Sequence, residues 1–187
     1  LALAFLNSAG VRQMAGYTVP TWFGYAGWGL LDYFVEQPGR FTLCEAFHAN
    51  GHALVHRLES EAAPRDAKGL AFDRDVVAFY GDPAWEARMA PGKLQFDQTL
   101  TDRGGVFTLT ITPRDGLRSF VPVNTNGSQR GGRPIVAFLP RRLADVEIVS
   151  GGEWQPVVTD TFVLVPLPPA DRAAPVEIVF RGRSAGP

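Results

Sequence analysis

An aromatic loop is the first group of residues that could do chemistry. Trp22, Phe23, Tyr25 and Trp28 fall within seven residues and stand among several glycines. Flat rings beside flexible glycines make an apolar wall that can hold a side chain or a peptide. The alternative is structural, because the same rings can cover the edge of a sheet or a neighbouring domain. From composition alone, the structural interpretation is favoured.

Three histidines form a second candidate group. His48, His52 and His56 are four residues apart, which places them along one face of a helix. A pair at this spacing can chelate zinc. No glutamate follows a histidine as in the zinc-peptidase motif, however, and the stripe lies opposite an apolar face. We therefore expect a solvated helix face without a bound metal.

Cys44 is the only cysteine, so an intramolecular disulfide and a cysteine-based zinc motif are excluded. A place near the start of a helix can lower a thiol pKa. Cysteine is nevertheless among the most buried residue types, and we expect Cys44 in the core.

The sequence Gly81-Asp82-Pro83 indicates a structural turn that closes an apolar run. Because no glycine-rich phosphate loop or Gly-x-Ser-x-Gly motif is present, no cofactor and no complete catalytic set are predicted.

The first 92 residues have the periodicity of an α/β unit. Short apolar runs at 11–17 and 76–80 are typical of buried strands, the second covered on both faces. Between them, 28–35 and 41–59 are predicted to be helical. Strand, helix, helix and strand in this order predict a layer with a mainly parallel sheet. The longer helix carries an apolar stripe made of Leu43, Phe47, Leu54 and Leu58.

Two irregular segments interrupt this unit. Proline and glycine predict a loop over 18–27, which contains the aromatic residues, and 64–69 form a polar connector. The loop follows the first strand directly. Ligands bind at the carboxyl ends of strands in open α/β sheets, so the loop lies where a site is expected.

Residues 93–187 have the pattern of an all-β domain, with the boundary expected between Met89 and Lys93. Short β-rich runs recur between turn residues at the spacing of an antiparallel sandwich. The segment 124–133 is rich in glycine and asparagine and is predicted to be a mobile loop. The β-rich runs are 93–98, 106–112, 119–123, 135–139, 146–149, 155–158, 162–165 and 176–180.

Composition and charge limit the classes of binding partner that we expect. A net charge of −1 gives no reason to expect nucleic acid or an acidic membrane surface. The apolar start, Leu1 to Leu6, is too short for a signal peptide or a membrane span. It resembles the last turns of a helix, so we expect the chain to be a fragment of a longer polypeptide.

The order of these features resembles the C-terminal part of gingipain-type cysteine peptidases. The resemblance implies that 1–92 are part of a caspase-like three-layer α/β unit and that 93–187 are an immunoglobulin-like β-sandwich. It also implies secretion or display at the cell surface. The residues that carry it are Tyr17-Thr18-Val19-Pro20-Thr21-Trp22, the two helices, and Val76-Val77-Ala78-Phe79-Tyr80-Gly81-Asp82-Pro83-Ala84.

The resemblance further implies a function. The family's nucleophilic Cys and its His partner lie upstream of the strand that matches 11–17, so we expect them in a missing N-terminal part of the same protein. Trp22 matches the tryptophan that lines the pocket for the residue before the scissile bond, with Thr21, Phe23 and Tyr25 beside it. This implies the C-terminal portion of a cysteine endopeptidase whose partner is a peptide or protein substrate.

Three expectations follow from this interpretation. Trp22 should be partly exposed, Trp28 should pack inward, and the isolated chain should be inactive. The alternative function is a non-catalytic module that binds a protein or a glycan through the same loop. A metal-binding helix that uses the histidine stripe is a weaker third possibility.

Overall fold

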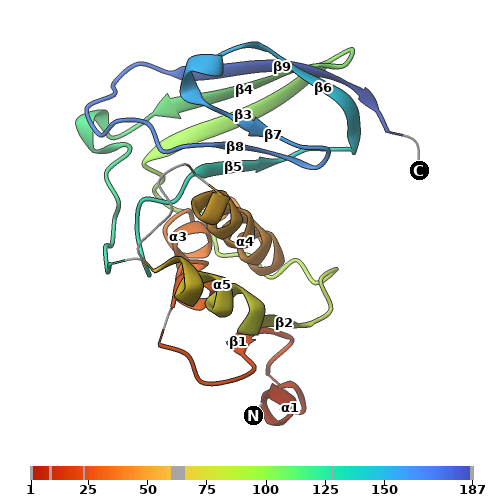
Figure 1. The fold of residues 1–187 in the computed structure, drawn as a ribbon, viewed down its shortest axis with the longest axis vertical. Coiled ribbons are helices and arrows are strands. Elements are labelled where there is room, and N and C mark those ends of the chain that lie inside the picture. The colour runs from red at the N-terminus through yellow and green to blue at the C-terminus, as the bar shows by residue number, and fades with distance from the viewer. Residues whose placement is uncertain (1, 9, 23, 60–65, 128, 186–187) are drawn as a thin grey trace. The chain divides into compact units, whose positions relative to one another are not determined.

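The structure is a computed structural model that divides into two compact units (Figure 1). The first unit contains 1–93 and 122–133, and the second contains 94–121 and 134–187. Residues 122–133 therefore pack with the first unit, although they lie between strands of the second unit in the sequence. The residues described are 2–8, 10–22, 24–59, 66–127 and 129–185.

The first unit is built of helices and one small sheet. No helix among the described residues is long and apolar enough to cross a membrane. The helices are α1 (Ala2–Leu6), α2 (Tyr25–Trp28), α3 (Leu31–Phe34), α4 (Leu43–Glu59) and α5 (Ala67–Val76), and the strands are β1 (Gln13–Tyr17) and β2 (Val77–Gly81).

The sheet of the first unit is antiparallel. Gln13 lies opposite Gly81, and Tyr17 lies opposite Val77. The prediction of a mainly parallel sheet is therefore wrong for the described strands. Helix α5, which was not predicted, occupies part of the expected connector and leads straight into β2, so it sets the direction in which that strand enters the sheet. The residues of β2 are half-buried or exposed and not covered on both faces.

Helix α4 begins with a capping box. The Thr42 hydroxyl accepts a hydrogen bond from the backbone N–H of Glu45 at 3.1 Å, and the Glu45 carboxylate accepts one from the N–H of Thr42 at 2.7 Å. This reciprocal pair explains why the helix starts at Leu43 and not at Phe41. Of the predicted apolar stripe, only Leu54 is fully buried. The buried face consists of Ala46, Ala49, Asn50, Ala53 and Leu54.

The second unit is an antiparallel β-sandwich. One sheet has the order β3-β4-β9-β6 and the other has the order β5-β8-β7. Of the predicted runs, only 119–123 is not a strand, because it follows a 3₁₀ turn at Gly116–Arg118. The strands are β3 (Phe96–Arg103), β4 (Val106–Pro113), β5 (Ile135–Phe138), β6 (Leu143–Ser150), β7 (Val157–Val158), β8 (Phe162–Val165) and β9 (Val176–Ser184).

The core of the sandwich follows the alternation in the sequence. Phe107, Leu109 and Ile111 on β4 are fully buried, whereas the threonines between them are only partly covered. The rings of Phe107 and Phe180 stack with their centroids 5.2 Å apart. Residues of both sheets contribute to this one core, as expected for two sheets packed face to face.

The strand order differs in one respect from a constant-type immunoglobulin domain. That arrangement places the first, second, fifth and fourth strands in one sheet and the third, sixth and seventh in the other. Here the last strand, β9, lies beside β4 in the place of the fifth, and β7 takes the place of the seventh. The four-plus-three division is the same, and two positions are exchanged.

The segment 122–133 is bound to the first unit through Asp32, which is only 6% exposed. The Asp32 carboxylate accepts hydrogen bonds from Nε of Arg130 and from the backbone N–H of Gly131, the latter at 2.8 Å. Nε of Arg133 lies 3.4 Å from the same carboxylate. The segment 124–133, which was predicted to be a mobile loop, is therefore attached near its end to a buried carboxylate.

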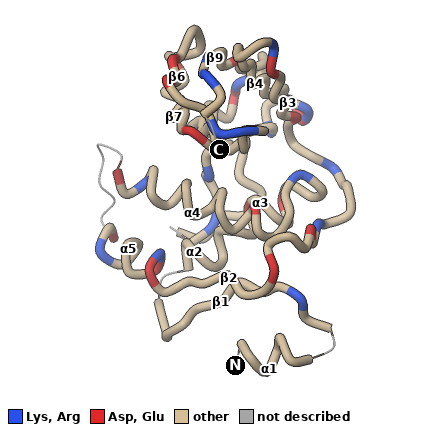
Figure 2. The backbone as a smooth tube through the Cα atoms, turned by 90° about the vertical axis from the view of Figure 1, so that its right-hand side faces the viewer, with Lys and Arg blue, Asp and Glu red and all other residues tan. Residues whose placement is uncertain are grey.

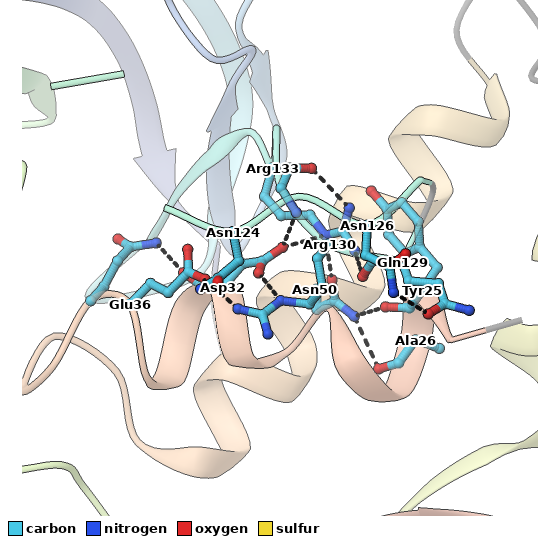
Figure 3. A network of polar contacts seen from close by, with 12 residues as sticks. Tyr25, Ala26, Asp32, Glu36, Asn50, Asn124, Asn126, Gln129, Arg130 and Arg133 are labelled. Carbon is cyan, nitrogen blue, oxygen red and sulfur yellow. Dashed lines mark hydrogen bonds and ion pairs between the residues drawn. The ribbon is translucent and has the colours of Figure 1, made fainter. Parts of the chain in front are cut away.

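Glu36 extends this network toward the start of the segment (Figure 3). Its carboxylate accepts hydrogen bonds from Nη2 of Arg130 and from the side-chain amide of Asn124, the latter at 2.6 Å. Burial raises the pKa of Glu36, whereas the amide of Asn124 and the charge of Arg130 act in the opposite direction. Each of the two carboxylates is therefore paired with an arginine of the segment.

Arg133 is enclosed by groups of α2 and α4. Its guanidinium carbon lies 3.5 Å from the centroid of the Tyr25 ring, and its Nε donates to the side-chain oxygen of Asn50 at 3.1 Å. The Asn50 amide in turn donates to the carbonyl oxygens of Tyr25 and Ala26, at 2.8 and 3.0 Å. A Cβ atom at Gly29 would lie 2.2 Å from Nη2 of Arg133 and 2.3 Å from the carbonyl oxygen of Tyr25, so this position needs a residue without a side chain.

We predict that Asp32→Ala destabilises the chain by about 3–5 kcal/mol, because it removes the carboxylate that pairs with two largely buried guanidinium groups. The free energy of unfolding in urea measures the effect. The matched control is Asp160→Ala, which removes an exposed carboxylate bonded to Arg142 at 2.6 Å and should leave the unfolding midpoint nearly unchanged. Equal midpoints for the two variants would contradict the structural role of the network.

Candidate functional site

The loop between β1 and α2 carries Trp22, whose side chain is 96% exposed. The prediction that this ring is exposed is confirmed. Trp28 is 58% exposed, and a Cβ atom at Gly24 would lie 2.6 Å from its ring. The loop therefore presents one nearly free indole, and a second indole lies against its glycine.

Hydrogen bonds on both sides hold the base of this loop. The backbone N–H of Thr18 donates to the carbonyl oxygen of Val76 at 2.8 Å, and its hydroxyl donates to the same oxygen at 3.0 Å. On the other side, the Tyr17 hydroxyl accepts from the backbone N–H of Gly27 at 2.8 Å. The loop is therefore attached at both ends to the elements that flank it.

Asp73 of α5 lies beneath the loop and is fully buried. Its carboxylate accepts a hydrogen bond from the backbone N–H of Ala26 at 2.6 Å. Burial raises the pKa of Asp73, and hydrogen bonds from Ala26, Tyr17 and Thr21 act against that rise. Burial and the contact with Asp73 also raise the pKa of the Tyr17 phenol. The side chains of Asp73 and Tyr17 therefore hydrogen-bond to the backbone at the end of the loop, inside the first unit.

The predicted site residues do not all lie at one surface. Trp22 is exposed, and Thr21 is half-buried beside Asp73. Phe23 lies outside the described residues. Tyr25 is only 2% exposed and packs with Leu54 and Leu70, so its prediction as part of a pocket wall is wrong.

The expected inward packing of Trp28 is also wrong. Helix α2 has a single turn, and its buried positions are Tyr25 and Ala26. The indole of Trp28 therefore lies on the outer side of that turn. Trp28 and Tyr25 have thus exchanged the expected roles: the tryptophan is exposed, and the tyrosine belongs to the core.

Cys44 is half-buried and not a core residue as predicted. Burial raises the pKa of its thiol, and the charge of Glu45 adds to the rise. His48 follows one turn later on the same helix. Among the described residues, no hydrogen bond joins this thiol to an imidazole. Thiolate chemistry needs a lowered pKa or an adjacent base, and the surroundings of Cys44 raise the pKa of its thiol instead.

The three histidines of α4 differ in their exposure. His48 is exposed, whereas His52 and His56 are half-buried. Burial, followed by the charge of His48, lowers the pKa of His52. In the part of the chain that the structure describes, no three metal-ligating side chains are gathered.

The turn at Gly81-Asp82-Pro83 is held by a hydrogen bond. The Asp82 carboxylate accepts it from the backbone N–H of Ala84 at 2.9 Å, so the prediction of a structural turn is confirmed.

Two contributors to the site were not found from the sequence. Asp73 lies on a helix that was not predicted, and Gln129 lies in the segment that was expected to be mobile. The side-chain amide of Gln129 donates to the carbonyl oxygen of Trp22 at 3.4 Å. A single aspartate or glutamine gives no periodic signal, so neither contact could be read from spacing.

Comparison with known proteins gives no relative of this chain. No protein family, no curated protein and no solved structure matches it.

We predict a pH-dependent contribution of Asp73 to stability. Because its native pKa is raised, the native state holds the proton more tightly than the unfolded chain, whose value is near 3.8. Its contribution is therefore fully present below about pH 3.8 and is lost as the pH rises through the native pKa. Asp73→Asn does not titrate, so wild type should lose stability relative to this variant as the pH rises. Urea unfolding across this range tests it, and a constant difference would contradict it.

Proposed function

We propose that the chain is the C-terminal portion of a gingipain-like cysteine endopeptidase and that Trp22 lines the pocket for the residue before the scissile bond. The observation that carries this proposal is the exposure of Trp22, at 96%, on a loop whose base is held by hydrogen bonds to Asp73 and Tyr17. An aromatic ring offers a large contact area at low cost in conformational entropy. A held loop with a free indole therefore suits the recognition of a peptide side chain.

In this proposal the chain binds and positions, and another part of the protein reacts. A cysteine thiolate attacks the peptide carbonyl, and a histidine transfers protons. The raised pKa of Cys44 supports the assignment of this thiolate to the N-terminal part of the same protein. The described residues would supply the pocket wall, and a peptide or protein is the substrate.

The strands at the edges of the first sheet lack features that prevent further pairing. This supports the proposal that the sheet continues into that N-terminal part. Figure 2 shows that neither β1 nor β2 carries a charged residue. The edge strand β6 of the second unit differs, since it contains Asp145 and Glu147 and two register shifts. Charges and bulges protect sheet edges from further pairing, and β1 and β2 have neither device.

The proposal includes the finer description of both units. The first unit is taken as part of a caspase-like domain, in which β1 and β2 provide an antiparallel pair at the edge of a mixed sheet. The second is taken as immunoglobulin-like, with the exchange of two strands described above. Secretion or display at the cell surface belongs to the same proposal.

A non-catalytic binding module is the second candidate function. It is favoured by the pair of exposed indoles, Trp22 and Trp28, since aromatic rings also stack on sugars and fill protein interfaces. The two functions differ in what accompanies the loop: an endopeptidase needs a reactive Cys–His pair in the intact protein, and a binding module does not.

We predict that the isolated chain has no peptidase activity, because its one thiol has a raised pKa and no imidazole is bonded to it among the described residues. A panel of fluorogenic peptides measures the activity of the chain and of Cys44→Ala. Hydrolysis that disappears in Cys44→Ala would place the nucleophile in this chain and would overturn the proposal.

In the intact endopeptidase, we expect Trp22→Ala to lower kcat/KM by about 10- to 100-fold, because a lost aromatic wall is worth roughly 1.5–3 kcal/mol. The stability of the protein should change little, since the ring is exposed. Tyr25→Ala is the matched control: it removes a buried ring and should destabilise the fold by about 3 kcal/mol or more. Full activity of the Trp22→Ala enzyme would show that the ring does not contact substrate.

A further inference from the structure

One side chain of the segment 122–133 reaches the Trp22 loop. The amide nitrogen of Gln129 donates to the carbonyl oxygen of Trp22 at 3.4 Å. Gly24 permits this approach, because a Cβ atom there would lie 3.1 Å from the amide carbon of Gln129. The exposed part of the loop therefore has a contact in addition to the hydrogen bonds at its base.

Gln129 is itself held in place by its neighbours (Figure 3). Its backbone oxygen accepts a hydrogen bond from Nη2 of Arg133 at 2.7 Å. Its backbone N–H donates to the carbonyl oxygen of Asn126 at 2.9 Å, and its side-chain oxygen accepts from the Asn126 amide at 3.1 Å. Hydrogen bonds to both the backbone and the side chain of Gln129 therefore hold its amide in position.

A continuous series of contacts joins this amide to the interior of the first unit. Arg133 lies against the ring of Tyr25 and bonds to Asn50, which is 1% exposed. The series therefore runs from Asn50 through Arg133 and Gln129 to the carbonyl of Trp22. A loop that is held before binding loses less conformational entropy when a ligand arrives.

From this series we propose that Gln129 is a positioning residue for ligand contact at Trp22. Its hydrogen bond restricts the directions in which the loop presents the indole, and Gln129 itself need not touch the ligand. The effect on binding rests on the proposed function, whereas the restriction of the loop does not. A single neutral hydrogen bond of this kind should change kcat/KM by about 3- to 10-fold.

The test uses Gln129→Glu, which keeps the size of the side chain and its acceptor for Asn126 but removes the donor to Trp22. The loop is observed through Trp22 alone, after the other tryptophans, Trp28, Trp85 and Trp154, are replaced by phenylalanine. We expect a lower fluorescence anisotropy of Trp22 at an unchanged unfolding midpoint. The control is Gln98→Glu, whose amide donates to Val136 of the second unit at 2.9 Å and should leave Trp22 unaffected.

Turnover by the intact endopeptidase separates the two proposals. Gln129→Glu should lower kcat/KM by about 3- to 10-fold, and it should cause no further loss when Trp22 is already alanine. Unchanged anisotropy of Trp22 in Gln129→Glu would overturn the positioning role, whatever the turnover. Greater mobility of Trp22 with unchanged turnover would support that role and count against Trp22 as a pocket wall.

Discussion

The buried carboxylate of Asp32 is the constraint on which the first unit depends. An ionised carboxylate out of water is unfavourable by several kcal/mol unless it is paired and hydrogen-bonded. Its arginine partners both come from the segment 122–133, and Arg130 is 98 residues away in the sequence. The segment cannot leave without uncovering this charge. For this reason a stretch that lies between sandwich strands in sequence packs with the first unit.

The same network determines how the aromatic loop is presented. Arg133 covers Tyr25, which places that ring in the core, and the hydrogen bond from Arg133 to Gln129 leads on to the carbonyl of Trp22. Asp73 and Tyr17 hold the base of the loop from below. The backbone of the loop is thus fastened from two sides, while the indole of Trp22 stays in water. That combination supports a recognition site better than exposure alone.

Local patterns predicted local structure well and long-range structure poorly. The alternation over 106–112 identified β4 and its buried face, because side chains of a strand point to opposite sides in turn. The direction of β2 was missed, since it depends on α5, a helix that takes the place of part of the connector predicted over 64–69. The segment 124–133 was read as mobile from its glycine and asparagine content. Its ion pairs with Asp32 and Glu36 join distant parts of the chain, and no spacing rule reports such contacts.

The candidate site shows the same limit. The aromatic loop was found from its composition, and the exposure of Trp22 agreed with expectation. Composition could not distinguish Trp22 from Tyr25 or Trp28, because tertiary contacts decide which ring faces the core. Asp73 and Gln129 were missed, since each acts through one contact with the loop.

The backbone amide of Gly131 provides the most direct test of this account, because its N–H donates to the buried carboxylate of Asp32 at 2.8 Å. Hydrogen exchange of this amide, followed by NMR in the whole chain, should show protection comparable to that of the α4 interior, such as Ala49 and Ala53. In a mobile segment the same amide would exchange at the rate of an unprotected peptide. Strong protection is the predicted result, and unprotected exchange would contradict the claim that 122–133 belong to the first unit.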